Sequence, residues 1–177
     1  MQINLDHIDT PALLLDLNKM EKNIADIASF AKVAGVNVRP HTKTHKSIQV
    51  AKRQIEAGAV GLTVAKVGEA EVMVAGGIND ILIAYPLASR EKLERVKALM
   101  NQAKITVAVD SIEQANIMEE IFDTSTPLNV WIKVNSGLNR VGVEPNGEVL
   151  ELAKHISGLQ SLQLDGIFTH AGHSYGA

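Results

Sequence analysis

The stretch Val36-Asn37-Val38-Arg39-Pro40-His41-Thr42-Lys43-Thr44-His45-Lys46 decides between the fold classes open to this sequence. It begins as a short strand-like run and continues into a turn that contains no glycine. A doubly wound α/β sheet normally carries a glycine-rich phosphate turn after its first strand. The stretch therefore favours the other common way of alternating strands and helices, a TIM-like (β/α)8 barrel, in which reactive side chains follow the strands.

The same order of strand-like run, turn and amphipathic helix recurs along the chain. Strands are predicted at residues 36–39, 60–64, 80–84, 105–109, 128–134 and 162–168. Helices are predicted at residues 18–34, 66–75, 89–102, 111–122 and 148–157. Strands that alternate with helices at intervals of about 20 to 25 residues indicate βα units and a parallel sheet. The predicted fold class is therefore α/β.

The length of the chain sets a limit on this barrel. A complete barrel has eight βα units and about 200 residues or more, whereas this chain has 177 residues and six predicted strands. The sequence from His170 to Ala177 follows the last strand-like run directly, without a helix to cover it. We therefore expect residues 1–177 to form one incomplete barrel domain, truncated after about six strands.

The composition argues against several classes of function. The net charge of −3 leaves no basic excess to neutralise a nucleic-acid backbone. The absence of cysteine excludes disulfides, thiolate nucleophiles and cysteine zinc sites, and it is compatible with a reducing compartment. The acidic start of the chain and its short apolar runs indicate neither export nor a membrane span. We expect a cytoplasmic protein whose partner is a small molecule.

Four of the six histidines lie in two groups, at positions 41 and 45 and at positions 170 and 173. If the strand continues past Arg39, His41, Lys43 and His45 share one face and point into the barrel. Burial disfavours the charged form of a lysine, and a neutral amine can attack an aldehyde to form a Schiff base. The alternative is a solvated, lysine-rich turn. A zinc site of His41 and His45 is disfavoured, because the glutamate of that motif is missing and two lysines repel a cation.

Two further groups follow the fifth and sixth predicted strands. Lys133 lies on the fifth strand, and Arg140 ends a loop with two glycines, where a guanidinium suits an anionic oxygen. His170 could stack on a planar ligand, and Tyr175 could bond a phosphate or a carboxylate. Taken singly, Arg140 is more readily interpreted as a surface arginine of a βα loop, and His170 equally as a core histidine. Together with the turn at Lys43, they would converge on one cavity at the ends of barrel strands.

The runs at residues 10–16, 39–46, 137–142 and 170–175 resemble the D-threonine aldolase and D-serine dehydratase family. That family shares the alanine-racemase-like barrel, fold type III of the pyridoxal-phosphate enzymes. The resemblance implies that Lys43 is the catalytic lysine that bonds the cofactor, that Arg140 lies near its phenolic oxygen and that His170 lies against its pyridine ring. The residues predicted to bind pyridoxal phosphate are His41, Lys43, Arg140, His170 and Tyr175.

The resemblance also separates the branches of this fold. Lys133 and Arg140 have the seven-residue spacing of the racemase branch. Racemases, however, place a tyrosine four residues after the lysine that bonds the cofactor, and Ser47 stands there in this chain. The resemblance therefore implies a lyase that acts on D-amino acids. We predict a D-threonine aldolase-like enzyme that cleaves a β-hydroxy-D-amino acid to glycine and an aldehyde, with D-serine dehydratase or a racemase as alternatives.

The same resemblance implies further parts of the complete enzyme. It implies a divalent metal with ligands in a C-terminal β-domain outside this chain, so we predict no metal ligand here. The run at residues 12–17 would pair with that β-domain, and two copies of the chain would form a homodimer. Two alternatives of another class remain: an inactive fragment of a barrel, and a pyridoxal-phosphate carrier without catalytic activity.

Overall fold

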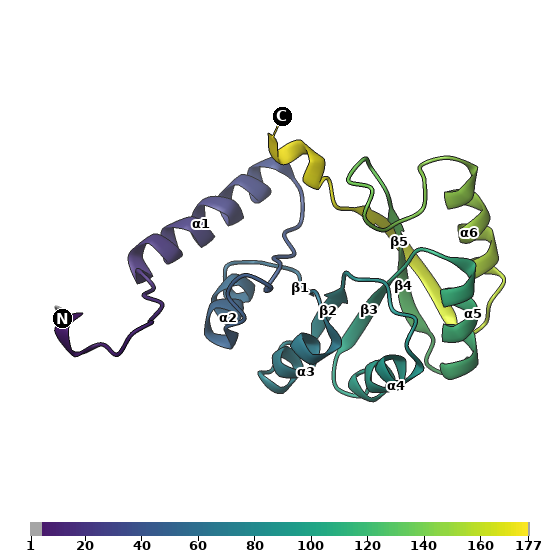
Figure 1. The fold of residues 1–177 in the computed structure, drawn as a ribbon, viewed down its shortest axis with the longest axis horizontal. Helices are drawn as coiled ribbons and strands as arrows, with labels where there is room; N and C mark the ends of the chain where they lie inside the picture. The colour runs from purple at the N-terminus through teal and green to yellow at the C-terminus, as the bar shows by residue number, and fades with distance from the viewer. Residues whose placement is uncertain (1–4, 177) are drawn as a thin grey trace.

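The structure is a computed structural model that describes residues 5–176 (Figure 1). Within these residues one sheet contains the strands β1 (Leu62–Val64), β2 (Asp80–Ile83), β3 (Lys104–Val109), β4 (Leu128–Val134) and β5 (Leu162–Thr169). The α-helices are α1 (Leu17–Ala34), α2 (Ile48–Glu56), α3 (Val67–Ala75), α4 (Arg90–Leu99), α5 (Ile112–Ile121) and α6 (Gly147–Ser157). Short 3-10 helices lie at η1 (Leu5–His7) and η2 (Gly172–Gly176).

The strands follow one another in the sheet in the order β1-β2-β3-β4-β5, and each pairs with the next in parallel. The helices α3, α4, α5 and α6 each contact the next one along the chain, so they cover the same face of the sheet (Figure 1). Parallel strands in sequential order with right-handed crossovers are the arrangement of a barrel wall. The predicted α/β class is confirmed, and the described residues form an open sheet because β1 and β5 do not pair.

The first predicted strand, at residues 36–39, is not a strand in the structure. Its backbone nevertheless runs beside β1, because Val60 N–H donates to Val38 O (2.9 Å) and Thr63 N–H donates to Pro40 O (2.7 Å). Pro40 has no N–H to give to a ladder, and among the described residues no strand lies on the other side of this segment. The described sheet therefore contains five strands, not six.

Side chains alternate along the strands between the two faces of the sheet. On β3 and β4, Ile105, Val107, Val130 and Ile132 are buried in the core against the helices. Lys133 lies at the intervening position on β4 and takes the opposite, inner face, as the period of two requires. The pattern of the sequence therefore separates the core face from the inner face, which carries Lys133.

The last strand of the described sheet has an uncovered outer side. No α-helix follows β5 within the described residues, where only the short 3-10 helix η2 comes after it. Ile167 on this strand is 64% exposed. At the other end of the molecule, α1 extends away from the sheet (Figure 1), and its predicted apolar face is partly bare, with Phe30 71% exposed. The helix itself is confirmed: Asp16 caps it by accepting from Lys19 N–H, and Gly35 ends it at φ 67°.

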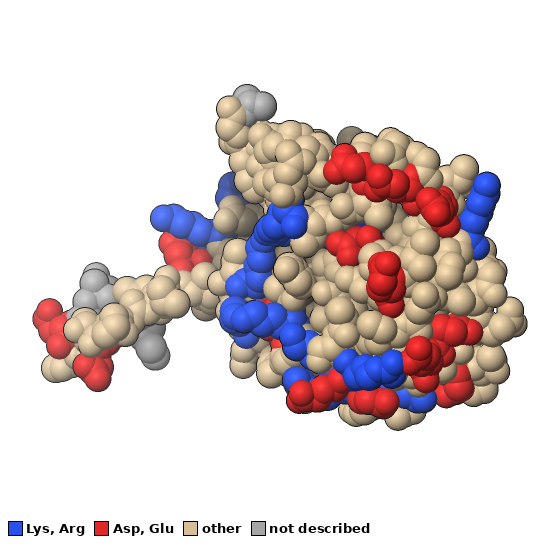
Figure 2. Space-filling model, turned by 45° about the vertical axis from the view of Figure 1, so that its right-hand side comes forward, with Lys and Arg blue, Asp and Glu red and all other residues tan. Residues whose placement is uncertain are grey.

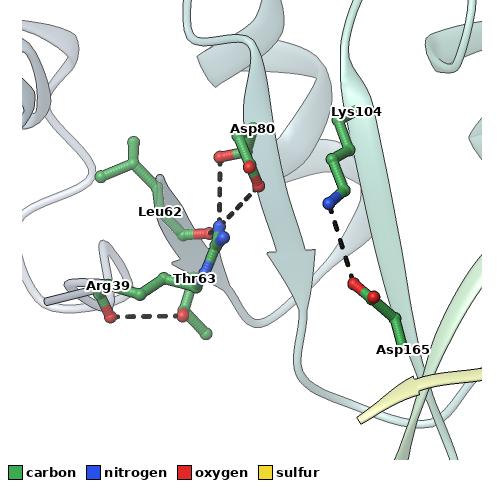
Figure 3. A network of polar contacts seen from close by, with 6 residues as sticks. All are labelled: Arg39, Leu62, Thr63, Asp80, Lys104 and Asp165. Carbon is green, nitrogen blue, oxygen red and sulfur yellow. Dashed lines mark hydrogen bonds and ion pairs between the residues drawn. The ribbon is translucent and has the colours of Figure 1, made fainter. Parts of the chain in front are cut away.

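A polar network lies at the N-terminal end of the sheet (Figure 3). Arg39 forms an ion pair with Asp80 (2.7 Å), and Lys104 forms one with Asp165 (3.7 Å). A Cβ on Gly61 would collide with the guanidinium of Arg39 and would lie 2.7 Å from the carbonyl oxygen of Asp80. Glycine at position 61 is therefore what allows Arg39 to cross the start of β1.

The surface carries both signs of charge. Figure 2 shows Lys and Arg gathered in a band on one face of the molecule, beside separate acidic clusters. No helix among residues 5–176 combines the length and the apolar character that a membrane span requires.

Candidate functional site

A cavity of about 330 Å³ opens at the C-terminal ends of the strands, where a barrel carries its active site. Its volume lies within the range of small-molecule sites. The lining residues come from the segment after Arg39, from β1, β2, β4 and β5, and from the loop after β4: His41, Lys43, Thr63, Ala65, Leu82, Ala84, Tyr85, Lys133, Arg140, Phe168, Thr169 and His170. The structure thus brings together four of the five predicted cofactor residues, and Tyr175 does not line the cavity.

Lys43 lies on a turn at the rim of this cavity. Thr42, not Lys43, is fully buried, and its N–H donates to Thr63 O (2.9 Å) at the end of β1. Lys46 N–H then donates to Thr42 O (2.8 Å), which closes the turn. The expected alternation of His41, Lys43 and His45 along a strand is therefore wrong. The extended chain ends at His41, so Lys43 is an exposed residue of a turn and reaches the cavity from its edge.

The two histidines of this segment have different surroundings. His41 lines the cavity, and its Nδ1 accepts a hydrogen bond from Lys43 N–H (3.2 Å). Burial, and next the charge of Lys43, lower the pKa of His41, while Glu69 acts in the opposite direction. His45 lies outside the cavity, and its Nδ1 accepts from Ser47 N–H (3.1 Å). Among residues 5–176, no group of three or more side chains is arranged to hold a metal ion.

Lys133 is a buried lysine of the cavity. Only 4% of its surface is exposed. Its Nζ donates to Ala84 O (3.1 Å) and lies 4.4 Å from the centroid of the Phe168 ring. Burial and then the charge of Arg140 lower the pKa of Lys133, and Asp110 opposes them in part. Lys133 was not among the predicted site residues. Its neighbours on β4, Ile132 and Val134, pack on the core face, and this alternation indicates that Lys133 faces inward.

Arg140 is carried by a loop that Asn135 holds in place. Asn135 is 8% exposed, and its Oδ1 accepts from the N–H groups of Gly137 (3.1 Å) and Asn139 (3.0 Å). Its Nδ2 donates to Asn139 Oδ1 (2.8 Å) and to Glu144 Oε1 (2.7 Å). One buried amide therefore uses all four of its side-chain hydrogen-bonding positions on the loop that presents Arg140. Asn135 was not among the predicted site residues, although an asparagine before Ser-Gly is typical of such a turn.

His170 follows β5 and lines the cavity opposite the turn of Lys43. Its ring meets the Tyr175 ring edge to face, with centroids 5.8 Å apart, and Tyr175 itself is 81% exposed. Burial, and then the charges of Arg140, Lys43 and Lys133, lower the pKa of His170. The structure therefore places Tyr175 beside His170 and outside the cavity.

The charged residues that line the cavity are all basic. Lys43, Lys133 and Arg140 are cationic, and no aspartate or glutamate is among the described residues that line the cavity. The lowered pKa values of His41 and His170 favour their neutral forms near neutral pH. The site therefore combines an accessible amine, a guanidinium on a well-held loop, two neutral imidazoles and the aromatic wall of Phe168. Such a site fits an anionic, planar molecule with an electrophilic carbon.

Comparison with known proteins agrees with this chemistry. The family described as "Alanine racemase, N-terminal domain" matches residues 15–176. The chain is 34% identical to 3-hydroxy-D-aspartate aldolase of Paracoccus denitrificans, with 93% of this chain and 43% of that protein covered. It is 36% identical to D-threo-3-hydroxyaspartate dehydratase of Delftia sp. (strain HT23), with 99% and 47% covered. It is 34% identical to D-threonine aldolase of an Arthrobacter species, with 95% and 45% covered.

The similar solved structures also include an aldolase and a dehydratase of D-amino acids. The D-threonine aldolase of Filomicrobium marinum has a TM-score of 0.88 and 39% sequence identity, with 92% of this chain and 44% of that chain covered. The Delftia dehydratase has a TM-score of 0.91 at 34% identity, with 99% and 47% covered. The chain thus spans about half the length of the curated relatives and structures it matches.

Proposed function

The chain belongs to the alanine racemase N-terminal domain family, and on that premise we propose that it forms the cofactor-binding part of a pyridoxal-phosphate-dependent lyase acting on β-hydroxy-D-amino acids. The observation that carries the proposal is the convergence of Lys43, Arg140 and His170 on one cavity without a lining carboxylate among the described residues. Relatives named as aldolases and dehydratases of such amino acids support it.

The described residues fit pyridoxal phosphate. The cofactor is a planar pyridine aldehyde with an anionic phosphate, and the cavity offers an amine, cations and aromatic side chains. When bound, it supplies a conjugated ring that accepts the electron pair of a bond broken at the substrate Cα. In our proposal, Lys43 would hold the cofactor at its aldehyde carbon, whose oxygen leaves as water, and Arg140 would donate to an anionic oxygen of the bound group.

The histidines complete this arrangement. Because Nδ1 of His41 accepts from Lys43 N–H, the neutral ring carries its proton on Nε2 and acts as a donor there. His170 presents a neutral, flat ring for packing against the pyridine. Lys133, beside Phe168 in the wall of the cavity, is almost fully buried, and its positive charge would favour an anionic ligand.

Within this class, we propose cleavage of the Cα–Cβ bond to give glycine and an aldehyde. Two relatives named as aldolases favour this reaction. The dehydration of a β-hydroxy-D-amino acid is the second candidate, because the Delftia dehydratase is 36% identical to this chain. We further propose a divalent metal held outside the described residues, a homodimeric enzyme and a cytoplasmic location. A metal-free form of the Delftia dehydratase among the similar structures supports the metal.

The test is chemical labelling of the purified protein. Pyridoxal phosphate is added and reduced with borohydride, and the modified lysine is located by mass spectrometry. Lys43→Ala should abolish the label, whereas Lys52→Ala, on the exposed side of α2, should retain it. D-threonine, 3-hydroxy-D-aspartate and D-serine are then supplied with a divalent metal, and glycine and ammonia are measured. A label on Lys43 with turnover supports the lyase, and a label without turnover fits the carrier or the inactive-fragment alternative. No label on Lys43 would refute the proposed role.

A further inference from the structure

Glu69 is a shielded carboxylate that stands beside the cavity without lining it. It lies in the first turn of α3, and its side chain is 13% exposed. Oε2 accepts a hydrogen bond from Ala65 N–H (2.8 Å), directly after β1, and Oε1 lies 3.1 Å from Nζ of Lys46. Ala65 lines the cavity, and Lys46 ends the turn that carries Lys43. One carboxylate thus joins the end of a strand to the end of the lysine turn.

We propose that Glu69 is a positioning residue that locks the Lys43 turn onto the C-terminal end of β1 by binding Lys46. The inference deepens the proposed function, on which it rests for the importance of Lys43. It concerns only residues of this chain, so it can be tested with and without the cofactor.

The turn is anchored unevenly. At its start, Thr42 N–H donates to Thr63 O. The bonds of the Lys43 and Lys46 amides stay within the segment, since they go to His41 Nδ1 and Thr42 O. Among the described residues, the contact that ties the later part of the turn to another element runs from Lys46 to Glu69 of α3. His45 lies near Gln54 of α2, but its Nε2 makes no hydrogen bond. The bond to Glu69 is the one between opposite charges, which makes it the stronger type of hydrogen bond.

The contact with Glu69 also bears on the unusual backbone conformation of Lys46. Lys46 has φ 50°, in the left-handed region that a lysine adopts only when its surroundings hold it there. Its side chain is otherwise well exposed, at 61%. Burial works against the charge of Glu69, but the Ala65 N–H bond and Lys46 outweigh it and lower the pKa of the carboxyl. Glu69 is therefore ionised at neutral pH and available to Lys46.

A simpler role for Glu69 is that it only caps α3. A glutamate in the first turn commonly reaches back to a preceding N–H, and Lys66, the N-cap residue, makes no side-chain capping bond. Capping of α3 and pairing with Lys46 predict different effects for two variants. Glu69→Gln can still accept from Ala65 N–H but cannot pair with a cation, and Lys46→Met removes the pairing while leaving the cap intact.

The experiment measures amide hydrogen exchange at Lys43, Lys46 and Ser47 in the cofactor-free protein. We expect Glu69→Gln and Lys46→Met each to speed exchange at these amides by about three- to tenfold. The double variant should show no further increase, because both changes remove the same contact. Glu71→Gln is the matched control, since Glu71 lies on the same helix and pairs with Arg95 instead. It should leave the three amides unchanged.

Binding of pyridoxal phosphate gives a second measurement. Both variants should weaken binding by a similar factor of about three to ten, and Glu71→Gln should not. Equal exchange in Glu69→Gln and the wild type overturns the proposal. An effect of Glu69→Gln without one of Lys46→Met assigns Glu69 to capping alone and also overturns it. If Glu69→Gln unfolds, the exposed Lys46→Met decides by itself. The proposed function fails by a different result, which is the absence of the borohydride-reduced label on Lys43 of the wild type.

Discussion

Lys133 and Phe168 are register partners on the adjacent strands β4 and β5, and the ammonium of Lys133 lies 4.4 Å from the centroid of the Phe168 ring. The lysine has a backbone carbonyl and an aromatic face as partners, with no carboxylate within ion-pair distance among the described residues. A buried cation of this kind is retained at some expense to stability, which is common where charge serves a ligand.

The first prediction is that Lys133→Met stabilises the fold while weakening the site. Methionine fills a similar volume without a buried charge, so we expect the free energy of unfolding to rise by about 1 kcal/mol. Binding of pyridoxal phosphate should weaken, because the cavity loses a positive charge. Denaturant unfolding and a binding titration check the two halves. A destabilised variant would show that the ammonium contributes net stability through Ala84 and Phe168.

The pH dependence of stability tests the same residue. The pKa of Lys133 is lowered in the folded protein, so the unfolded chain binds more protons between that pKa and the ordinary lysine value near 10.4. The contribution of Lys133 to stability is therefore fully present above the ordinary value and is lost as the pH falls through the lowered one. Between the two values the free energy of unfolding should rise with pH, and Lys133→Met should flatten this rise.

The loop of Arg140 should respond to a change at Asn135. Asn135→Asp keeps both acceptors for Gly137 and Asn139 but loses the two donor bonds and sets a carboxylate against Glu144. We expect the free energy of unfolding to fall by about 2 to 3 kcal/mol. Glu144→Gln in the same chain should restore much of the loss, because an amide can donate to the new carboxylate. Loss without rescue would mean that Glu144 is not the partner that matters.

The histidines of the cavity should titrate below their ordinary value of about 6.5. Burial is the first cause for both, and the cations of the site are the next. Lys43→Met should raise the midpoint of His41, and Arg140→Met should raise that of His170. Nuclear magnetic resonance of the imidazole protons measures each midpoint separately. Unchanged midpoints in both variants would show that these cations do not act on the rings.

Two glycines of the inner face should differ in their tolerance of a methyl group. Gly61→Ala places a Cβ against Arg39 and 2.7 Å from Asp80 O, so we expect a loss of more than about 2 kcal/mol. Gly166→Ala meets Trp131 at 3.5 Å, an ordinary contact, and should change stability by less than about 1 kcal/mol. Thermal unfolding of the pair provides the comparison. Similar losses in both variants would contradict it.

The sequence predicts the alternation of strands and helices well because hydrophobic periodicity is local. The predicted strand at residues 128–134 coincides with β4, and the helix at 18–34 differs from α1 by one residue. For the segment at Lys43 the sequence left an inward-facing strand and a solvated turn open, and the structure shows the turn. A period of two does not reveal that Thr42 O accepts from Lys46 N–H and ends the extended chain. Helix α2 was not predicted, although Ser47 caps it.

The grouping of the candidate site residues could be predicted from their types and from their positions after strands. Lys43, Arg140, His41 and His170 are found in the sequence by type and position, and the cavity brings them together. Their supports are not found so easily. Glu69 and Lys46 are separated in the sequence by α2 and β1. Their contact therefore has no short-range sequence pattern that would predict it. Tyr175 follows His170 closely in the sequence, but in the structure its ring packs on His170 and does not line the cavity.

The bare side of β5 affects how this protein can be handled. An edge strand offers unpaired backbone groups to any other strand, and an exposed isoleucine on it adds apolar surface. We therefore expect self-association to grow with concentration, and a charged residue in place of Ile167 to reduce it without altering the cavity, since Ile167 does not line it. The behaviour of residues 1–177 at high concentration would then depend on one strand at the border of the described sheet, and a single substitution on its outer side would change it.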